Sequence, residues 1–230
     1  MTYTSALIVG AGSGLSASLA RLFAKQGMRV ALAARSVDDL AALAKETSAK
    51  TYGCDASQRP QVDRLFAALD ADGGAPDVVV YNASYRTRGP LAELDPAEVE
   101  RSIAISAFGG FLVAQAAVKR MLPRGRGAIL FTGASASVKG YAQSAAFAMG
   151  KFALRGLAQS MARELHLKGI HVAHFVIDGG IRSARRPEPP DQPGSLLDPD
   201  AIAENYLHLL RQPRSAWTQE IELRPWVERF

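Results

Sequence analysis

The sequence predicts an α/β fold, a doubly wound parallel sheet of about seven strands with helices on both faces. Apolar runs typical of buried strands alternate along the chain with runs whose apolar residues recur at helical spacing, which is the pattern of a parallel sheet covered by helices. The chain has 230 residues, of which 48% are hydrophobic and 21% charged, and no linker or shift of composition interrupts it. We therefore expect a single domain over residues 1–230.

The predicted elements follow the chain in order and are separated by glycine, proline and capping residues. Ser36 with Asp39 resembles a capping box, Ser57 is a candidate helix cap, and Asp95 followed by Pro96 is a strong helix start. The predicted strands lie within residues 5–10, 28–34, 51–55, 77–82, 124–133, 170–177 and 218–223. The predicted helices begin near residues 15, 36, 57, 96, 144 and 199, and the two longest span about 96–121 and 144–167.

The segment between Asp178 and Asp198 differs from the rest because it is rich in proline and arginine and poor in apolar residues. We expect a mobile lid loop at about 182–198, lying over the carboxyl ends of the strands. The tail RPWVERF carries Trp226 and Phe230, which we expect to pack against the domain.

Composition excludes several classes of function. The net charge of +5 and the pI of about 9.5 suit an anionic ligand, but the basic residues are spread over many segments, so we expect no nucleic acid partner. The apolar runs are broken well short of the ~20 residues of a membrane span, so we expect no membrane contact. Cys54 is the only cysteine and the histidines show no metal spacing, so we expect a cytoplasmic protein without a metal, in which His174 is a satisfied core histidine.

Residues 10–20 read GAGSGLSASLA and join the first predicted strand to a helix. At such a junction backbone N–H groups and the positive helix end converge on one point, where a phosphate would bind. The spelling G-x-G-x-x-G fails here, because Leu15 stands where the third glycine should be. A tight turn without a ligand is the alternative interpretation.

The spelling G-x-x-x-G-x-G fits better, with Gly10, Gly14 and Ser16 in the three places, and with it the chain resembles the short-chain dehydrogenase/reductase family over nearly its whole length. This resemblance implies a Rossmann-type dinucleotide-binding fold. Ser16 is small and its hydroxyl can donate to a phosphate, so we expect this turn to keep its dinucleotide binding despite the change from glycine. The shorter matching segments are CDA at 54–56, YNAS at 81–84, which is similar to the family's N-N-A-G, and DGGIRS at 178–183, which is similar to P-G-x-[VI]-x-T.

Arg35 decides which dinucleotide we expect. It follows the second strand, where an acidic residue would accept hydrogen bonds from the ribose hydroxyls of NAD, and its guanidinium suits a 2′-phosphate, so NADP(H) is preferred over NAD(H). A solvated Arg35 is the alternative, and Asp38 and Asp39 are better explained as first-turn helix residues. The residues that the resemblance places at the cofactor are Gly10, Ser13, Gly14, Leu15, Arg35, Ser36, Asp55, Ala56, Asn82, Ala83, Lys151, Gly179, Ile181 and Ser183.

In the family, carbonyl reduction uses a Tyr and a Lys four residues apart, an earlier Ser and an Asn from the preceding long helix. FAMGK at 147–151 keeps Lys151 but places Phe147 at the tyrosine position. The family's spacing places Ala134 at the serine and Ser106 at the asparagine. A phenyl ring cannot supply a proton, so we do not expect the usual mechanism. Lys151 can still hold the nicotinamide ribose, and a solvated helix lysine is the alternative.

Tyr141 is the best candidate for a substitute proton donor, because it lies on the loop that enters the same helix and Lys151 could activate its hydroxyl. A loop tyrosine packed against the surface is the alternative. Ser135, Ser137 and Ser144 flank the region, but a serine hydroxyl is a poor acid at neutral pH.

Three functions remain open. The first is an NADP(H)-dependent oxidoreductase with a non-standard proton donor, or with a substrate such as an imine or an activated double bond. The second is a catalytically impaired sensor or partner subunit that binds the dinucleotide without turnover. The third is a non-redox lyase or isomerase on the same fold. The small-molecule substrate is not identified, and Arg182, Arg185 and Arg186 give only a weak indication of an acidic ligand.

The resemblance also implies self-association. Members of the family dimerise or tetramerise through their two long helices, here about 96–121 and 144–167, whose small and apolar residues suit such an interface. We therefore expect a homodimer or homotetramer.

Overall fold

The computed structural model describes residues 3–228, which form one seven-stranded parallel sheet in the order β3-β2-β1-β4-β5-β6-β7. Each predicted strand is present, so the predicted fold class is confirmed. The strands are β1 Ser5–Val9, β2 Arg29–Ala34, β3 Lys50–Gly53, β4 Val78–Tyr81, β5 Gly127–Thr132, β6 Ile170–Ile177 and β7 Glu220–Leu223.

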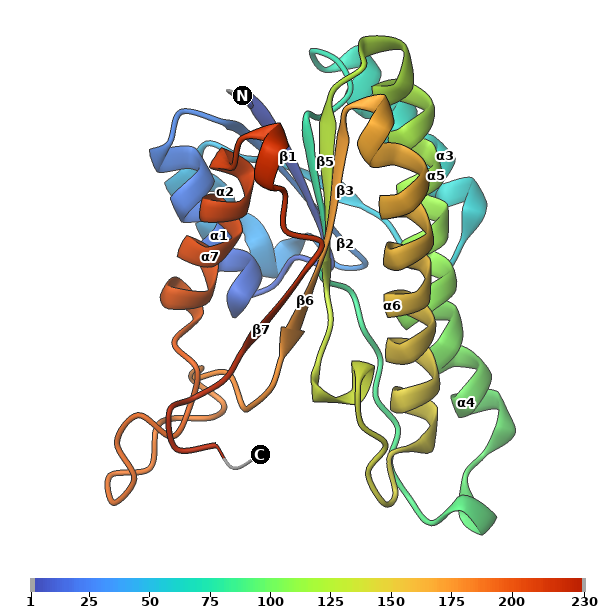
Figure 1. The fold of residues 1–230 in the computed structure, drawn as a ribbon, viewed down its shortest axis with the longest axis vertical. Coiled ribbons are helices and arrows are strands. Elements are labelled where there is room, and N and C mark those ends of the chain that lie inside the picture. The colour runs from blue at the N-terminus through green and yellow to red at the C-terminus, as the bar shows by residue number, and fades with distance from the viewer. Residues whose placement is uncertain (1–2, 229–230) are drawn as a thin grey trace.

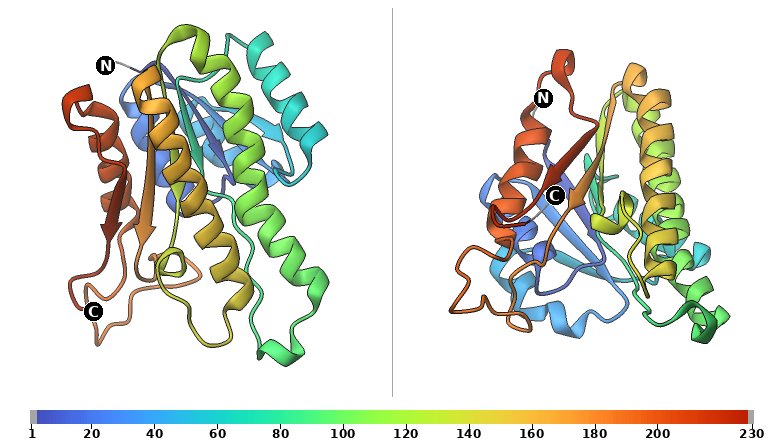
Figure 2. Two further views of the ribbon diagram at one scale, coloured as in Figure 1. Left: turned by 45° about the vertical axis from the view of Figure 1, so that its right-hand side comes forward. Right: turned by 60° about the horizontal axis from the view of Figure 1, so that its bottom comes forward.

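Two layers of helices cover the sheet (Figure 1). One face carries α1 Leu15–Lys25, α2 Ala41–Thr47 and α7 Pro199–Arg211, and the other carries α3 Arg59–Ala71, α4 Pro96–Ile103, α5 Gly109–Met121 and α6 Ala145–Leu165. A π-helical turn, Ala104–Phe108, joins α4 to α5, and the resulting rod lies beside α6 (Figure 2). The strand order reverses between β1 and β4, so the crevice in which open α/β sheets bind ligands lies at their carboxyl ends.

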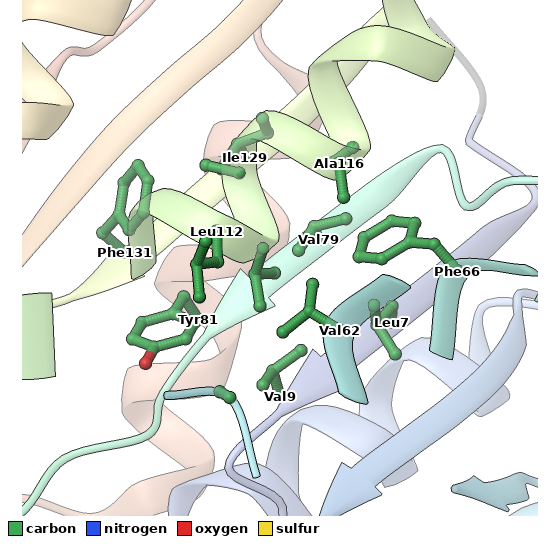
Figure 3. Close-up of a cluster of buried hydrophobic side chains, with 14 of the residues drawn as sticks. Leu7, Val9, Val62, Phe66, Val79, Tyr81, Leu112, Ala116, Ile129 and Phe131 are labelled. Carbon is green, nitrogen blue, oxygen red and sulfur yellow. The ribbon is translucent and has the colours of Figure 1, made fainter. Parts of the chain in front are cut away.

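The core has two halves because successive side chains of a strand point to opposite faces of the sheet. Leu7 and Val9 of β1 face the layer of α3, α5 and α6, and Figure 3 shows them packed with Phe66 and Tyr81. Ile8, between them, belongs to the half beneath α1 and α7. The strands are thus buried on both faces, which explains their nearly continuous apolar sequences.

Tyr81 couples the end of β4 to the helical rod. Its side chain is fully buried, and its hydroxyl donates to the carbonyl oxygen of Ile105 in the π-helical turn. Glycine is required opposite it, since a Cβ on Gly109 would lie 2.4 Å from the Tyr81 hydroxyl oxygen. A side chain that bonds to a helix carbonyl is one known cause of such a turn, and this turn carries Ser106.

Two of the predicted helix caps are wrong. A 3₁₀ turn, Asp38–Leu40, precedes α2, and no side chain caps either start. Ser57 lies before α3, where its N–H and hydroxyl both donate to the Asp55 carboxylate instead of capping the helix. Asp95 does cap α4, because its carboxylate accepts from the N–H of Ala97.

The predicted lid segment is irregular, and backbone bonds close its stem. The N–H of Leu197 donates to the Gly180 carbonyl oxygen at 2.8 Å, and the N–H of Arg182 donates to the Leu197 carbonyl oxygen at 2.8 Å. Trp226 beyond β7 is 84% exposed, with an edge of its indole beside Gly194, so within this chain the expectation that the tail aromatics pack is not met for Trp226. Phe230 lies outside the described residues.

One helix within residues 3–228, Pro96–Arg124, is long and apolar enough to cross a membrane by length and composition alone. This criterion tolerates the glycines and charged residues that interrupt the run, and the expectation of no membrane contact stays a prediction. Half of the helix's most apolar stretch is buried, and core helices of soluble proteins meet the same criterion. The cytoplasmic location stays a prediction.

Candidate functional site

Two adjoining cavities lie at the carboxyl ends of the strands, with volumes of about 580 Å³ and about 590 Å³. Asn82 and Ser84 belong to the walls of both. The β2-side cavity is lined by residues 9–11, 34–36, 39, 54–56, 82–84 and 105. The α6-side cavity is lined by residues 14–15, 82, 84, 86, 132–136, 141, 147, 151, 177, 179, 181, 183 and 185–186. All of the residues predicted to bind the cofactor line one of these cavities except Ser13, which is exposed beside them.

The glycine turn between β1 and α1 has the shape of a cradle. Gly10 has a φ of +82°, and a Cβ on it would lie 2.4 Å from the backbone nitrogen of Ala83, so no other residue fits. At Gly12 and Gly14, in contrast, a Cβ would meet no atom within 4 Å. The first turn of α1 holds no acidic residue. The turn therefore leaves room for an anion next to the positive end of the helix.

Ser16, which stands where the family has its third glycine, does not face that space. Its hydroxyl donates to the carbonyl oxygen of Gly10 at 3.1 Å and accepts a bond of 2.7 Å from the side-chain amide of Asn82. The hydroxyl is therefore engaged within the protein rather than available to a phosphate, and dinucleotide binding at this turn stays a prediction. The buried position of Ser16, 1% exposed, makes it the link between the glycine turn and the end of β4.

Arg35 and Ser36 lie on the wall of the β2-side cavity, as does Asp39. Within residues 3–228 the Arg35 guanidinium makes no hydrogen bond or ion pair, so its donors are available to a ligand. Asp39 was explained as a helix residue alone, but its place on the wall puts a carboxylate within the same cavity. Asp55 uses one carboxylate oxygen to accept both bonds from Ser57.

Lys151 is buried in the α6-side cavity, so the alternative of a solvated helix lysine is wrong. Its side chain is 3% exposed, and its ammonium donates to the carbonyl oxygen of Thr132 at 2.7 Å. Burial lowers the pKa of Lys151 to about 8, which keeps most of the side chain charged at neutral pH. A buried ammonium without a carboxylate partner is costly, and such groups are found at functional sites.

Phe147 and Ala134 line the same cavity, whereas Ser106 does not. The ring of Phe147 lies beneath two cations, with the guanidinium carbon of Arg86 at 4.8 Å and the Lys151 ammonium at 5.7 Å from its centroid. No motif in the sequence singles out Arg86, and the only signal for it is its position on the loop that follows β4. Ser106 is buried, and its hydroxyl contacts the backbone nitrogen and oxygen of Tyr85 at 3.3 and 3.4 Å.

Tyr141 lines the α6-side cavity together with Lys151, and its side chain is 49% exposed. Tyr141 is thus near Lys151, as the candidate role requires, and its role as proton donor stays a prediction beside the alternative of a loop tyrosine packed against the surface. Two of the nearby serines have hydrogen-bond partners: Ser135 bonds to Asp178, and Ser137 accepts from the N–H of Ala134 at 3.1 Å. The hydroxyl of Ser144 is buried and has no hydrogen-bond partner among the described residues.

Asp178, where the family has a proline, joins the end of β6 to the loop after β5. Burial alone would raise the pKa of Asp178, but hydrogen bonds from Ser135 and Lys139 and the charges of Lys139 and Arg224 outweigh it and hold this pKa below its usual value. The Lys139 ammonium lies 3.0 Å from the carboxylate. Asp178 is thus ionised and bound to Lys139, and it lies beside the cavity without lining it.

His174 lies in β6 behind the cavity and is fully buried. Burial lowers the pKa of His174 to about 4, so the ring is neutral, and its Nδ1 lies 3.0 Å from Glu220. Among the described residues its Nε2 has no hydrogen-bond partner, so the expectation of a satisfied core histidine is wrong. This nitrogen faces Gly133, where a Cβ would lie 2.3 Å from it. Among the described residues no group of three or more histidine, cysteine or acidic side chains could hold a metal ion.

Comparison with known proteins agrees with the geometry. An uncharacterized oxidoreductase of Staphylococcus aureus is 27% identical over 98% of both chains. The crystal structure of a short-chain dehydrogenase from Rhodopseudomonas palustris is 34% identical and superposes with a TM-score of 0.84 over 98% of this chain and 100% of that one. A metagenomic short-chain oxidoreductase, solved in complex with NADP, is 29% identical with a TM-score of 0.84 over 97% of this chain and 98% of that one. Residues 4–188 match the family described as short chain dehydrogenase, and this chain therefore belongs to the short-chain dehydrogenase/reductase family.

Proposed function

We propose that this chain is an NADP(H)-dependent oxidoreductase that obtains its proton from a group other than the family's tyrosine. The observation that carries the proposal is the pair of adjoining cavities, with the glycine cradle and the unpaired Arg35 toward one end and the buried ammonium of Lys151 toward the other. The family membership and the NADP bound to the metagenomic relative support it.

The residues present suit this dinucleotide. The open space at Gly12 and Gly14 would take the pyrophosphate, Arg35 and Ser36 the 2′-phosphate, and Lys151 the nicotinamide ribose. The other wall residues predicted for the adenine and nicotinamide ends are Asp55, Ala56, Asn82, Ala83, Gly179, Ile181 and Ser183. When bound, NADPH supplies a hydride to the substrate, and one proton must reach the product for the atoms to balance.

Tyr141 is our candidate for the group that delivers this proton, assisted by the charge of Lys151. Phe147 and Ala134 present only apolar atoms at the two positions where the family has its tyrosine and serine, so neither can polarise a carbonyl oxygen. This apolar pair also favours the second candidate function, a dinucleotide-binding sensor or partner subunit without turnover. A substrate that yields no alkoxide would need its proton elsewhere: an imine takes it at nitrogen, and an activated double bond such as an enone takes it at the α-carbon.

Exposed apolar side chains near the starts of α5 and α6 support self-association. Phe108, Phe111, Met149 and Phe152 are 50%, 40%, 52% and 44% exposed, and the first two rings are stacked with their centroids 6.1 Å apart. Exposed apolar side chains on neighbouring helices are typical of subunit interfaces.

The first prediction concerns the cofactor. We expect calorimetry to show NADPH binding at least about tenfold tighter than NADH, and Arg35→Ala to weaken NADPH by about 10- to 100-fold because one charge-assisted contact is lost. Asp39→Asn distinguishes the alternative, since it weakens NADH binding only if that carboxylate holds the ribose. Arg163→Ala, an equal change of charge at the far end of α6, is the control. Binding of neither cofactor would refute both the oxidoreductase and the sensor.

The second prediction concerns the cost of burying Lys151, whose pKa is about 8 in the folded chain and 10.5 when exposed. The folded state binds fewer protons than the unfolded state between these values, so the free energy of unfolding must rise with pH across this window. Relative to Lys151→Met, the wild type should gain roughly 2 kcal/mol between pH 7.5 and pH 10, measured by urea unfolding. An unchanged difference between the two proteins would mean that Lys151 is not buried as a cation.

The third prediction concerns turnover. NADPH oxidation should be measurable on at least one member of a panel of ketones, aldehydes, imines and enones. On a carbonyl substrate Tyr141→Phe should lower kcat by about 100-fold or more without changing NADPH affinity, as loss of a general acid does. Tyr52→Phe, which removes a hydroxyl bonded to Asp72 outside the cavities, should leave kcat unchanged. Tight NADPH binding with no oxidation on any substrate would favour the sensor.

The fourth prediction concerns assembly. Light scattering after size exclusion should give at least twice the 24.5 kDa mass of one chain. The double variant Phe111→Asp and Phe152→Asp should shift the protein toward the monomer, because two charges would be desolvated in the interface. Leu167→Asp changes a residue that is 96% exposed beyond the end of α6, and it should leave the mass unchanged. A wild-type mass near 24.5 kDa would contradict the proposed interface.

A further inference from the structure

The charged residues that line the α6-side cavity are all cationic. Four of its lining residues are cationic, namely Arg86, Lys151, Arg185 and Arg186, and none of its lining residues is acidic. Carboxylates on the surrounding elements are engaged elsewhere. Asp178 pairs with Lys139, Asp198 with Arg182, Glu98 with Tyr85 and Arg101, and Glu188 accepts from the N–H of Gly194.

Among the three arginines of this cavity, Arg86 is the one that stacks on an aromatic ring. Its guanidinium stacks on Phe147 at 4.8 Å from the ring centroid, and within residues 3–228 it makes no hydrogen bond or ion pair. Burial and the neighbouring charges of Arg88 and Arg186 lower its pKa from the usual value. The structure therefore brings like charges together and leaves the donors of this guanidinium unused, an arrangement that an anion would stabilise.

Two serines of the neighbouring helical rod bond to the backbone of Tyr85, the residue before Arg86. Ser102 donates to the carbonyl oxygen of Tyr85 at 2.9 Å, and Ser106 contacts the backbone nitrogen and oxygen of Tyr85. The Tyr85 hydroxyl donates to Glu98 outside the cavity. Two residues at substituted family positions, Ser106 and Phe147, therefore both act on Arg86: one fixes the preceding backbone and the other supports the guanidinium.

Arg186 is positioned from the opposite wall. Its backbone N–H and carbonyl oxygen each bond to Ser183 at 3.0 Å, which forms a tight bend in the predicted lid. The side chain crosses Gly180, where a Cβ would lie 2.6 Å from the guanidinium nitrogen. Glycine at that position is thus what lets Arg186 approach the cavity.

We propose that the substrate carries a carboxylate and that Arg86, together with Arg186, binds this group in the α6-side cavity. A guanidinium stacked on an aromatic ring offers the N–H groups at its edge, and these match the two oxygens of a carboxylate. The assumption that this substrate also carries a reacting carbonyl rests on the proposed oxidoreductase function. Binding of the carboxylate does not depend on that function. Phosphate esters share the charge but not the planar two-oxygen geometry, and the test separates them.

Calorimetry at pH 7.5 with a matched set of ketones tests the proposal. The probes are 4-acetylbenzoate, its neutral isostere 4-acetylbenzamide and 4-acetylphenyl phosphate, each titrated with and without saturating NADP⁺. We expect the wild type to bind the benzoate at least about tenfold tighter than the amide, as one charge-assisted pair allows. Arg86→Gln and Arg186→Gln should each remove most of this preference while keeping weak binding of the amide.

Arg88→Gln is the control, because it removes the same charge from the same loop without lining the cavity. It should retain the preference for the carboxylate. Equal binding of benzoate and amide by the wild type, tighter binding of the phosphate than of the benzoate, or no saturable binding of any probe would each overturn the proposal. If the two glutamine variants lose NADPH affinity instead of the carboxylate preference, the arginines serve the cofactor and the proposal is again wrong. A failure to bind NADPH at all, with the carboxylate preference intact, would refute only the proposed function.

Discussion

The contact between the glycine turn and the end of β4 is the constraint on which both cavities depend. Gly10 approaches the backbone of Ala83 so closely that no side chain fits, and Ser16 bonds to both Gly10 and Asn82. These contacts fix the crevice at the point where the strand order reverses. In the family a third glycine permits close packing at this place. Here a buried serine adds two hydrogen bonds that tie the turn to the end of β4, and its small side chain stays out of the space beside Gly12 and Gly14.

Tyr81 has a comparable role on the other side of the crevice. It replaces a polar residue of the family's turn, fills the core beneath the helical rod and binds the carbonyl oxygen of Ile105. Gly109 and Gly110 make room for its ring. The same π-helical turn carries Ser106, which contacts the backbone of Tyr85 and does not line the α6-side cavity.

The sequence was sufficient to predict the sheet, its helices and most of the cavity walls, because strand and helix periods are local and the matching segments all follow strand ends. The sequence was insufficient where a side chain had more than one possible hydrogen-bond partner. Ser57 bonds to Asp55 rather than capping α3, and Ser16 bonds to Asn82 rather than facing a ligand. Arg86 was missed because nothing in its neighbourhood along the chain indicates that its partner is the ring of Phe147. Such contacts are decided by tertiary packing.

Charge balance links the two proposals. A tyrosine at position 147 could carry negative charge among Lys151, Arg86 and Arg186, whereas phenylalanine leaves those cations without a counterion in the cavity wall. The ring keeps its attraction for a guanidinium but offers no group that bonds to it. Loss of the hydroxyl therefore removes a proton donor and at the same time leaves a site that favours an anion. A carboxylate brought by the substrate would restore the balance, and its binding between the arginines would orient the rest of that molecule toward Tyr141 on the same wall.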